Sequence, residues 1–181
     1  MRISILVFLL LTFLCFSFIF SNSKMLEFSY PSRSETKLVM TNHEYGKFTA
    51  EWKGTDYSYF AQSKDSIICS VFYFKLNEQE QKKMTEPFGE STMAGIPFIF
   101  FSSNSQLRKY EINQSSWGEV TDEFMFRQND IIVTPTLKQK HMYGYCGFGK
   151  DLFVQVHFSK GNCSAADSIA MRQMLASLRK E

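Results

Sequence analysis

The stretch of sequence that decides the fold is Leu152-Phe153-Val154-Gln155-Val156-His157-Phe158-Ser159. Its residues alternate between an apolar row, formed by every second residue from Leu152 to Phe158, and a mixed row that contains Phe153, Gln155 and His157. A period of two is typical of a β-strand, because successive side chains point to opposite faces. The stretch therefore predicts a strand over residues 152–159.

A helix is predicted directly after this strand. Ser164 is a suitable N-cap, and Asp167 three residues later completes a pattern like a capping box. The residues that follow place a stripe of apolar side chains at helical spacing, namely Met171, Met174, Leu175 and Leu178. We expect this C-terminal helix to close the domain by packing its stripe on the core.

Further strands are predicted upstream. Residues 46–53 alternate, residues 57–62 follow a turn, and residues 67–74 are apolar at nearly every position, which is typical of a central strand. Residues 77–84 are polar and predict a short exposed helix that ends before Pro87. The remaining predicted strands cover residues 96–101, 109–113, 119–127, 130–134 and 142–148. The order predicts an α+β fold, in which an antiparallel sheet has helices packed on its faces.

The first residues have the pattern of an export signal. Ile3 to Phe20 carry no charge, Arg2 precedes them, and Ser21-Asn22-Ser23 follows. A positive start, an apolar run and small residues are typical of a secretory signal peptide, here cleaved after Ser23. Because the run approaches the roughly 20 residues that span a bilayer, an uncleaved membrane anchor is the alternative. Both place residues 24–181, expected to form a single domain, in a periplasmic or extracellular location.

The composition excludes several classes of protein. The chain has 20 Lys and Arg residues against 18 Asp and Glu, a net charge of +2, so a strongly basic nucleic-acid-binding protein is excluded and no nucleic-acid partner is expected. Hydrophobic residues make up 44 % of the chain, which excludes a disordered protein.

The cysteines support two alternative hypotheses. Cys69 lies in an apolar run and is expected to be a buried thiol, whereas Cys146 and Cys163 lie near loops and are the candidate disulfide pair. Alternatively, Cys146, which lies in the glycine-rich stretch from Gly144 to Gly149, is a nucleophile with His141 or His157 as its base. The second arrangement would make the protein a thiol-dependent hydrolase.

Cofactor chemistry finds no support in the sequence. The three histidines, His43, His141 and His157, lack the H-x-x-x-H spacing of a helical metal site, and the glycines around Cys146 lack the lysine of a phosphate-binding loop. We therefore predict neither a metal site nor a cofactor.

Aromatic residues are the candidate binding residues. Trp117, Tyr143, Tyr145 and Phe148 lie in segments rich in glycine or polar residues. Tyrosine and tryptophan are frequent anchors of protein–protein interfaces, so these four predict a surface that binds another protein. The alternative is that they pack at the edge of the sheet.

The order of motifs resembles the PsbP-like family, which includes exported bacterial proteins and extrinsic subunits of photosystem II. The resemblance rests on the leader, on Phe28-Ser29-Tyr30-Pro31, on Met93-Ala94-Gly95-Ile96-Pro97, and on residues 151–159 followed by Met174-Leu175-Ala176-Ser177-Leu178. It implies an antiparallel sheet sandwiched by helices and a non-catalytic role in assembly or binding. The chain lacks a tryptophan shortly after the Tyr-Pro pair, and no metal-binding residue of the family is placed here.

Three functions remain open from the sequence. The leading hypothesis is an exported, non-enzymatic protein of the cell envelope that binds or assembles with another protein. The second is the exported thiol-dependent hydrolase centred on Cys146. The third is an immunity protein that neutralises a toxin, which fits the size and the leader equally well.

Overall fold

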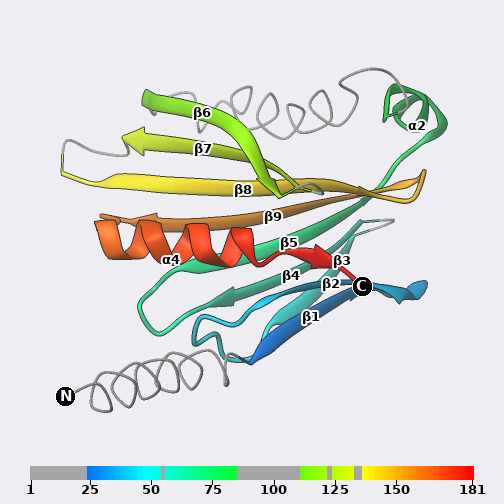
Figure 1. The fold of residues 1–181 in the computed structure, drawn as a ribbon, viewed down its shortest axis with the longest axis horizontal. Coiled ribbons are helices and arrows are strands. Elements are labelled where there is room, and N and C mark those ends of the chain that lie inside the picture. Colours follow the sequence, from blue (N-terminus) through cyan, green and yellow to red (C-terminus); the bar gives the residue numbers. More distant parts are fainter. Residues whose placement is uncertain (1–23, 54–55, 85–110, 122–123, 133–135) are drawn as a thin grey trace, which may run out of the picture.

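The computed structural model describes residues 24–53, 56–84, 111–121, 124–132 and 136–181, and these form two antiparallel sheets and two helices. The larger sheet contains, in spatial order, β3 (Thr49–Lys53), β4 (Asp56–Gln62), β5 (Ile68–Lys75), β9 (Leu152–Gly161), β8 (Lys138–Phe148), β7 (Phe124–Ile132) and β6 (Glu111–Thr121). The smaller sheet contains β1 (Met25–Tyr30), β2 (Arg33–Thr41) and β10 (Arg179–Lys180). The helices are α2 (Glu78–Met84) and α4 (Ala165–Ala176) (Figure 1).

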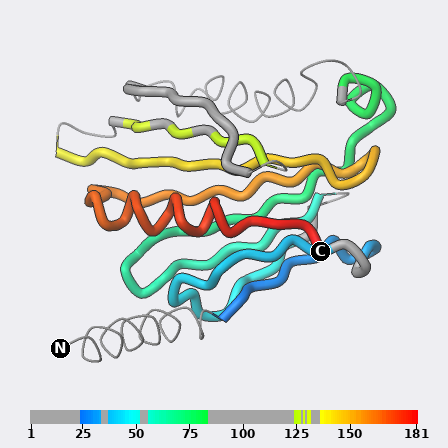
Figure 2. The backbone as a smooth tube through the Cα atoms, viewed as in Figure 1, coloured from blue at the N-terminus to red at the C-terminus, as the bar shows by residue number. Residues whose placement is uncertain are grey.

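The main core lies between the larger sheet, the smaller sheet and α4. Phe28 of β1 packs edge-on against Tyr59 of β4, with ring centroids 5.2 Å apart, and Tyr30 contacts Tyr73 of β5 at 6.0 Å. Helix α4 contacts β8, β9 and β2 and runs beside the smaller sheet (Figure 2). Buried side chains of both sheets and of the helix form one apolar cluster. Burial of apolar side chains in this cluster is the main favourable contribution to folding.

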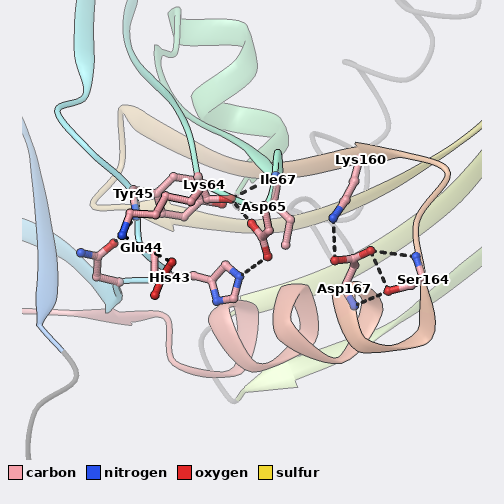
Figure 3. A network of polar contacts seen from close by, with 11 residues as sticks. His43, Glu44, Tyr45, Lys64, Asp65, Ile67, Lys160, Ser164 and Asp167 are labelled. Atoms are coloured by element: carbon pink, nitrogen blue, oxygen red, sulfur yellow. Dashed lines mark hydrogen bonds and ion pairs between the residues drawn. The ribbon is translucent and has the colours of Figure 1, made fainter.

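Helix α4 begins at the N-cap that the sequence predicts. The Ser164 hydroxyl accepts a hydrogen bond from the Asp167 amide at 3.2 Å, while the Asp167 carboxylate accepts from the Ser164 amide at 2.8 Å. Lys160 of β9 donates to the same carboxylate at 2.7 Å (Figure 3). These bonds, with the Lys160 contact first, lower the pKa of Asp167 to about 2. The start of the helix is thereby fixed to the end of the strand before it.

Gly144 of β8 allows α4 to approach the sheet closely. A Cβ atom at this position would lie 2.9 Å from Leu178 Cδ1 and 3.0 Å from Leu175 Cδ2. Both leucines are buried, at 2 % and 1 % exposure. The missing side chain is therefore what leaves room for the apolar stripe of the helix.

The predicted α+β class with an antiparallel sheet is confirmed in outline. The capping box of the C-terminal helix is present, and the Asn77 side chain accepts from the amides of Gln79 and Glu80 at the start of α2. Strands predicted at residues 46–53, 57–62, 67–74, 142–148 and 152–159 correspond to β3, β4, β5, β8 and β9.

Other parts of the predicted fold differ from the structure. The sequence did not predict β2 or the separate smaller sheet, because residues 33–41 mix polar and apolar positions without clear alternation. The strand expected over residues 119–127 is wrong, because it combines the end of β6 with the start of β7. The expected leader, residues 1–23, and the expected strand at residues 96–101 lie outside the described residues. Within the described ranges, no helix has the length and apolarity that crossing a membrane requires.

Replacement of Gly144 tests the packing of α4. We expect Gly144→Ala to lower the free energy of unfolding by about 1–3 kcal/mol, because the added methyl group must displace Leu175 and Leu178. Urea denaturation followed by circular dichroism measures the change. The matched control is Gly46→Ala, whose Cβ would meet no atom within 4 Å and which should change stability by less than about 0.5 kcal/mol. Equal stability of the two variants would contradict a close approach of α4 at Gly144.

Candidate functional site

The candidate site lies on the face of the larger sheet that points away from α4. Directly paired residues of antiparallel strands share a face, and successive residues of one strand alternate. Gly144 lies under α4, so Tyr143, its neighbour on β8, lies on the opposite face. This face, here called the outer face, carries Phe60, Ser70, Phe72, Phe74, His141, Tyr143, Tyr145, Phe153, Gln155, His157 and Ser159.

Two histidines form a direct hydrogen bond at the centre of the outer face. His141 Nδ1 and His157 Nε2 are 2.9 Å apart, the ring planes differ by 5°, and the ring centroids are 5.1 Å apart. Because the nitrogens are much closer than the centroids, the two rings meet edge to edge in nearly one plane. This is favourable geometry for an N–H···N bond.

The neighbouring amide indicates which nitrogen carries each proton. Gln139 Oε1 lies 3.3 Å from His141 Nε2, and a carbonyl oxygen only accepts. His141 is therefore assigned its proton on Nε2, which leaves Nδ1 to accept from the His157 Nε2–H group. The bond requires that one of the two facing nitrogens stays unprotonated.

Burial keeps both imidazoles neutral. His141 is only 7 % exposed, and burial lowers its pKa from 6.5 to about 4, against a small opposing effect of Asp130. Burial also lowers the pKa of His157, to about 3, and the charge of a protonated His141 would lower it further. Neither histidine is thus a cation at neutral pH.

The centre of the outer face is polar although it is buried. Ser70, His141, Gln155 and Ser159 are all at most 9 % exposed. The side-chain oxygen of Gln155 has no hydrogen-bond partner, and an unpaired buried acceptor costs roughly 1–3 kcal/mol. A buried polar row of this kind is not explained by core packing, so it is a candidate for function.

Aromatic side chains surround this polar centre. The Tyr143 ring stacks on the His157 ring, with centroids 4.5 Å apart and planes within 10°. Farther along the face, Phe72 and Phe74 stack at 6.1 Å, and Phe60 is 49 % exposed. A cleft of about 170 Å³ lies beside them, lined by Glu51, Asp56, Tyr57, Ser58, Phe72, Tyr73 and Phe74.

The four predicted anchor residues do not form one exposed surface. Tyr143 is half-buried on the outer face, and Tyr145 is on the same face but only 1 % exposed, because it packs on Phe153. Phe148 belongs to the core on the opposite face, where it contacts Tyr73 at 6.3 Å. The backbone of Trp117 on β6 pairs with Arg127 of β7, and Arg127 pairs in turn with Tyr143 of β8. Sequence reasoning missed Phe60, because its exposure depends on the folded sheet rather than on any local pattern.

The arrangement expected for a thiol-dependent hydrolase is absent from β8 and β9. Cys146 pairs with Val154 and is fully buried on the face under α4, whereas His141 and His157 lie on the outer face. The alternation of β8 separates the thiol from His141, which is an odd number of residues away. The structure therefore joins the two histidines with each other and not with the cysteine.

The expected disulfide between Cys146 and Cys163 is also absent, and both residues are thiols. Cys163 follows Asn162, whose amide donates to the carbonyl of Lys138 at the opposite end of β8 from Cys146. Lys138 and Cys146 are eight positions apart on the strand, which corresponds to about 26 Å at roughly 3.3 Å per residue. A disulfide requires Cα atoms within about 7 Å of each other.

A second polar cluster lies away from the outer face. His43 Nε2 lies 2.7 Å from a carboxylate oxygen of Asp65, and Ser63 donates to the other oxygen of the same carboxylate (Figure 3). A serine nucleophile is activated by a hydrogen bond to a histidine base. Here Ser63 contacts the carboxylate of Asp65 and not His43, so the cluster does not activate the serine. Across the described part of the chain, no three His, Cys, Asp or Glu residues are grouped as metal ligands.

The larger sheet, with the smaller sheet and α4 packed on the same face, has a PsbP-like fold. One similar solved structure is the solution structure of cyanobacterial PsbP (CyanoP) from Synechocystis sp. PCC 6803. The match has a TM-score of 0.56 at 9 % sequence identity and covers 88 % of this chain and 94 % of CyanoP. No family model matches the sequence, and no curated protein matches it. The likeness therefore concerns the fold.

Thiol labelling tests the placement of the cysteines. We expect iodoacetamide to modify Cys163 in the native protein, because it is partly exposed, and to spare Cys69 and Cys146 until the protein is denatured. Peptide mass spectrometry locates the modified residues, and Cys163→Ser is the control that should remove native labelling. Rapid native labelling of Cys146 below pH 7 would instead support the hydrolase hypothesis.

Proposed function

We propose that the protein is an exported, non-enzymatic protein of the cell envelope that binds or assembles with another protein through its outer face. The observation that carries this proposal is the half-exposed Phe60 on that face, which also carries the stacked pairs Phe72–Phe74 and Tyr143–His157. Aromatic residues are enriched in the cores of protein–protein interfaces and among their anchor residues.

The position of Phe60 supports a contact with a protein surface. In the register of the larger sheet, Phe60 pairs with Ser70, Ser70 with His157, and His157 with Tyr143. The row thus leads from an exposed aromatic ring to a half-buried one across four strands.

The placement of the chemically reactive side chains supports a role other than catalysis. Cys146 is buried away from both histidines, and His43 and Asp65 hold no nucleophile. The fold likeness to CyanoP is consistent with the non-catalytic role that the family resemblance implies. Export is supported by the apolar run of Ile3 to Phe20.

Export is tested by fractionation of the producing cells. We expect the protein in the envelope or secreted fraction, with an intact mass that corresponds to a chain starting at Lys24, because Ser21 and Ser23 suit signal cleavage. A full-length mass in the membrane fraction would identify the uncleaved anchor. Recovery of the full-length chain from the cytosol would contradict export.

Binding is tested by capture from solubilised envelope fractions. We expect Phe60→Ala and Tyr143→Ala each to reduce capture of a defined partner at least about tenfold, because interface aromatic residues contribute 2 kcal/mol or more. Mass spectrometry after cross-linking identifies the partner and the residues that it contacts.

The matched control is Ile169→Ala. Ile169 is 57 % exposed on α4, on the other side of the larger sheet, so its replacement should leave capture unchanged. Tyr145 is not a suitable test residue, because its removal would open a cavity in a packed cluster. Equal capture by wild type, Phe60→Ala and Tyr143→Ala would reject the outer face as the binding surface.

A further inference from the structure

The cleft of about 170 Å³ at the β3–β5 end of the outer face lies beside the exposed Phe60. We propose that this cleft receives an arginine side chain of the protein partner, which stacks on the rings of Phe72 and Phe74 and pairs with the carboxylate of Asp56. This inference rests on the proposed function, because it names the group by which a partner is recognised on the same face.

The register of three strands places acidic and aromatic side chains together in the cleft. Glu51 of β3 pairs with Ser58 of β4, and Ser58 pairs with Phe72 of β5, which is an outer-face residue. Asp56 and Phe74 lie two residues from Ser58 and Phe72 along their strands, so alternation puts them on the same face. The cleft therefore combines carboxylates with two aromatic rings.

The volume of the cleft suits one long side chain. At about 30 Å³ for each water molecule, the cleft has room for about six water molecules. Pockets that bury drug-sized ligands are larger, at about 300–1,000 Å³. The cleft is thus suited to a single side chain that projects from a protein surface, and not to a whole cofactor.

Asp56 is the acidic group of the cleft that is available for a new ion pair. Its side chain is exposed at the start of β4. Of the acidic side chains that the structure describes, only Asp56 and Glu78 have neither an ion pair nor a hydrogen bond. Glu51 takes part in another interaction, so the ion pair is assigned to Asp56 alone. A cation that enters the cleft would give this carboxylate its partner.

The rings of Phe72 and Phe74 favour arginine over other cations. Both side chains are half-buried, their ring centroids are 6.1 Å apart, and their planes differ by 22°. A guanidinium group is planar and weakly hydrated, so it stacks on aromatic faces while it donates to a carboxylate. The ammonium group of lysine has no such plane and holds its water more strongly. Arginine is also frequent among the anchor residues of protein interfaces.

The cleft is tested first in the isolated protein with a defined probe, N-acetyl-arginine amide. NMR spectra of the isotope-labelled protein are recorded as the probe is added. Two controls are N-acetyl-citrulline amide, which keeps the planar group without the charge, and N-acetyl-lysine amide, which keeps the charge without the plane. We expect the arginine probe to shift the resonances of Asp56, Phe72 and Phe74 and to bind more tightly than either control. No shift of these resonances, or equal affinity for the arginine probe and either control, would overturn the proposal.

Two matched variants separate the cleft from the overall charge of the protein. Asp56→Asn keeps the size of the side chain and removes its charge, whereas Glu78→Gln removes the other unpaired acidic charge, on α2 and outside the cleft. We expect Asp56→Asn to weaken binding of the arginine probe about threefold, as for an exposed ion pair. Capture of the partner should fall at least about tenfold, because there the pair is covered by the interface. Glu78→Gln should behave as wild type, and both positions are exposed, so neither substitution should disturb the fold.

The outcomes distinguish the arginine contact from the binding function. Loss of both probe binding and capture in Asp56→Asn would support the contact. Capture that depends on Phe60 but not on Asp56 would overturn the contact and leave the proposed function intact. Capture that depends on neither Phe60 nor Tyr143 would reject the proposed function, and the probe titration would then decide whether the cleft receives an arginine side chain.

Discussion

The antiparallel ladder between β8 and β9 is the constraint on which the rest of the structure depends. It joins β9, the central strand of the larger sheet, to its neighbour β8 and pairs every residue from Gln139 to Phe148 with a partner on β9. Because side chains alternate, the ladder sorts these residues between two environments. One face receives the apolar stripe of α4, and the other presents the histidine pair and its aromatic neighbours.

The two faces show different solutions to burial. Under α4, the close approach at Gly144 allows leucine side chains to fill the space above the strand, so the contact is almost entirely apolar. On the outer face, the buried imidazole of His141 hydrogen-bonds to the half-buried imidazole of His157, while Gln155 keeps an unpaired oxygen. A core selected only for stability would replace such groups with apolar ones. Their presence is the physical reason to propose a function for the outer face.

Sequence reasoning predicted most elements around this ladder but only part of the candidate site. The alternation of residues 152–159 and the capping box at Ser164 are local signals, and both elements formed as expected. His157 was singled out by type, yet its predicted partner was Cys146. The alternation of β8 placed that thiol on the other face. Phe60 gave no signal, because solvent exposure is not encoded in the local pattern.

The sequence by itself determined which residues share a face of each strand, where α4 begins, and that the protein has no marked excess of charge. Only the tertiary structure decided which residues of neighbouring strands lie opposite each other. The turn after β8 contains Gly149 at φ 66°, and it sets the register in which His157 faces Tyr143 and reaches His141. A period of two is a property of neighbouring residues, whereas register depends on the turn and on the match of whole faces. For that reason the pairing of the two histidines became visible only in the folded sheet.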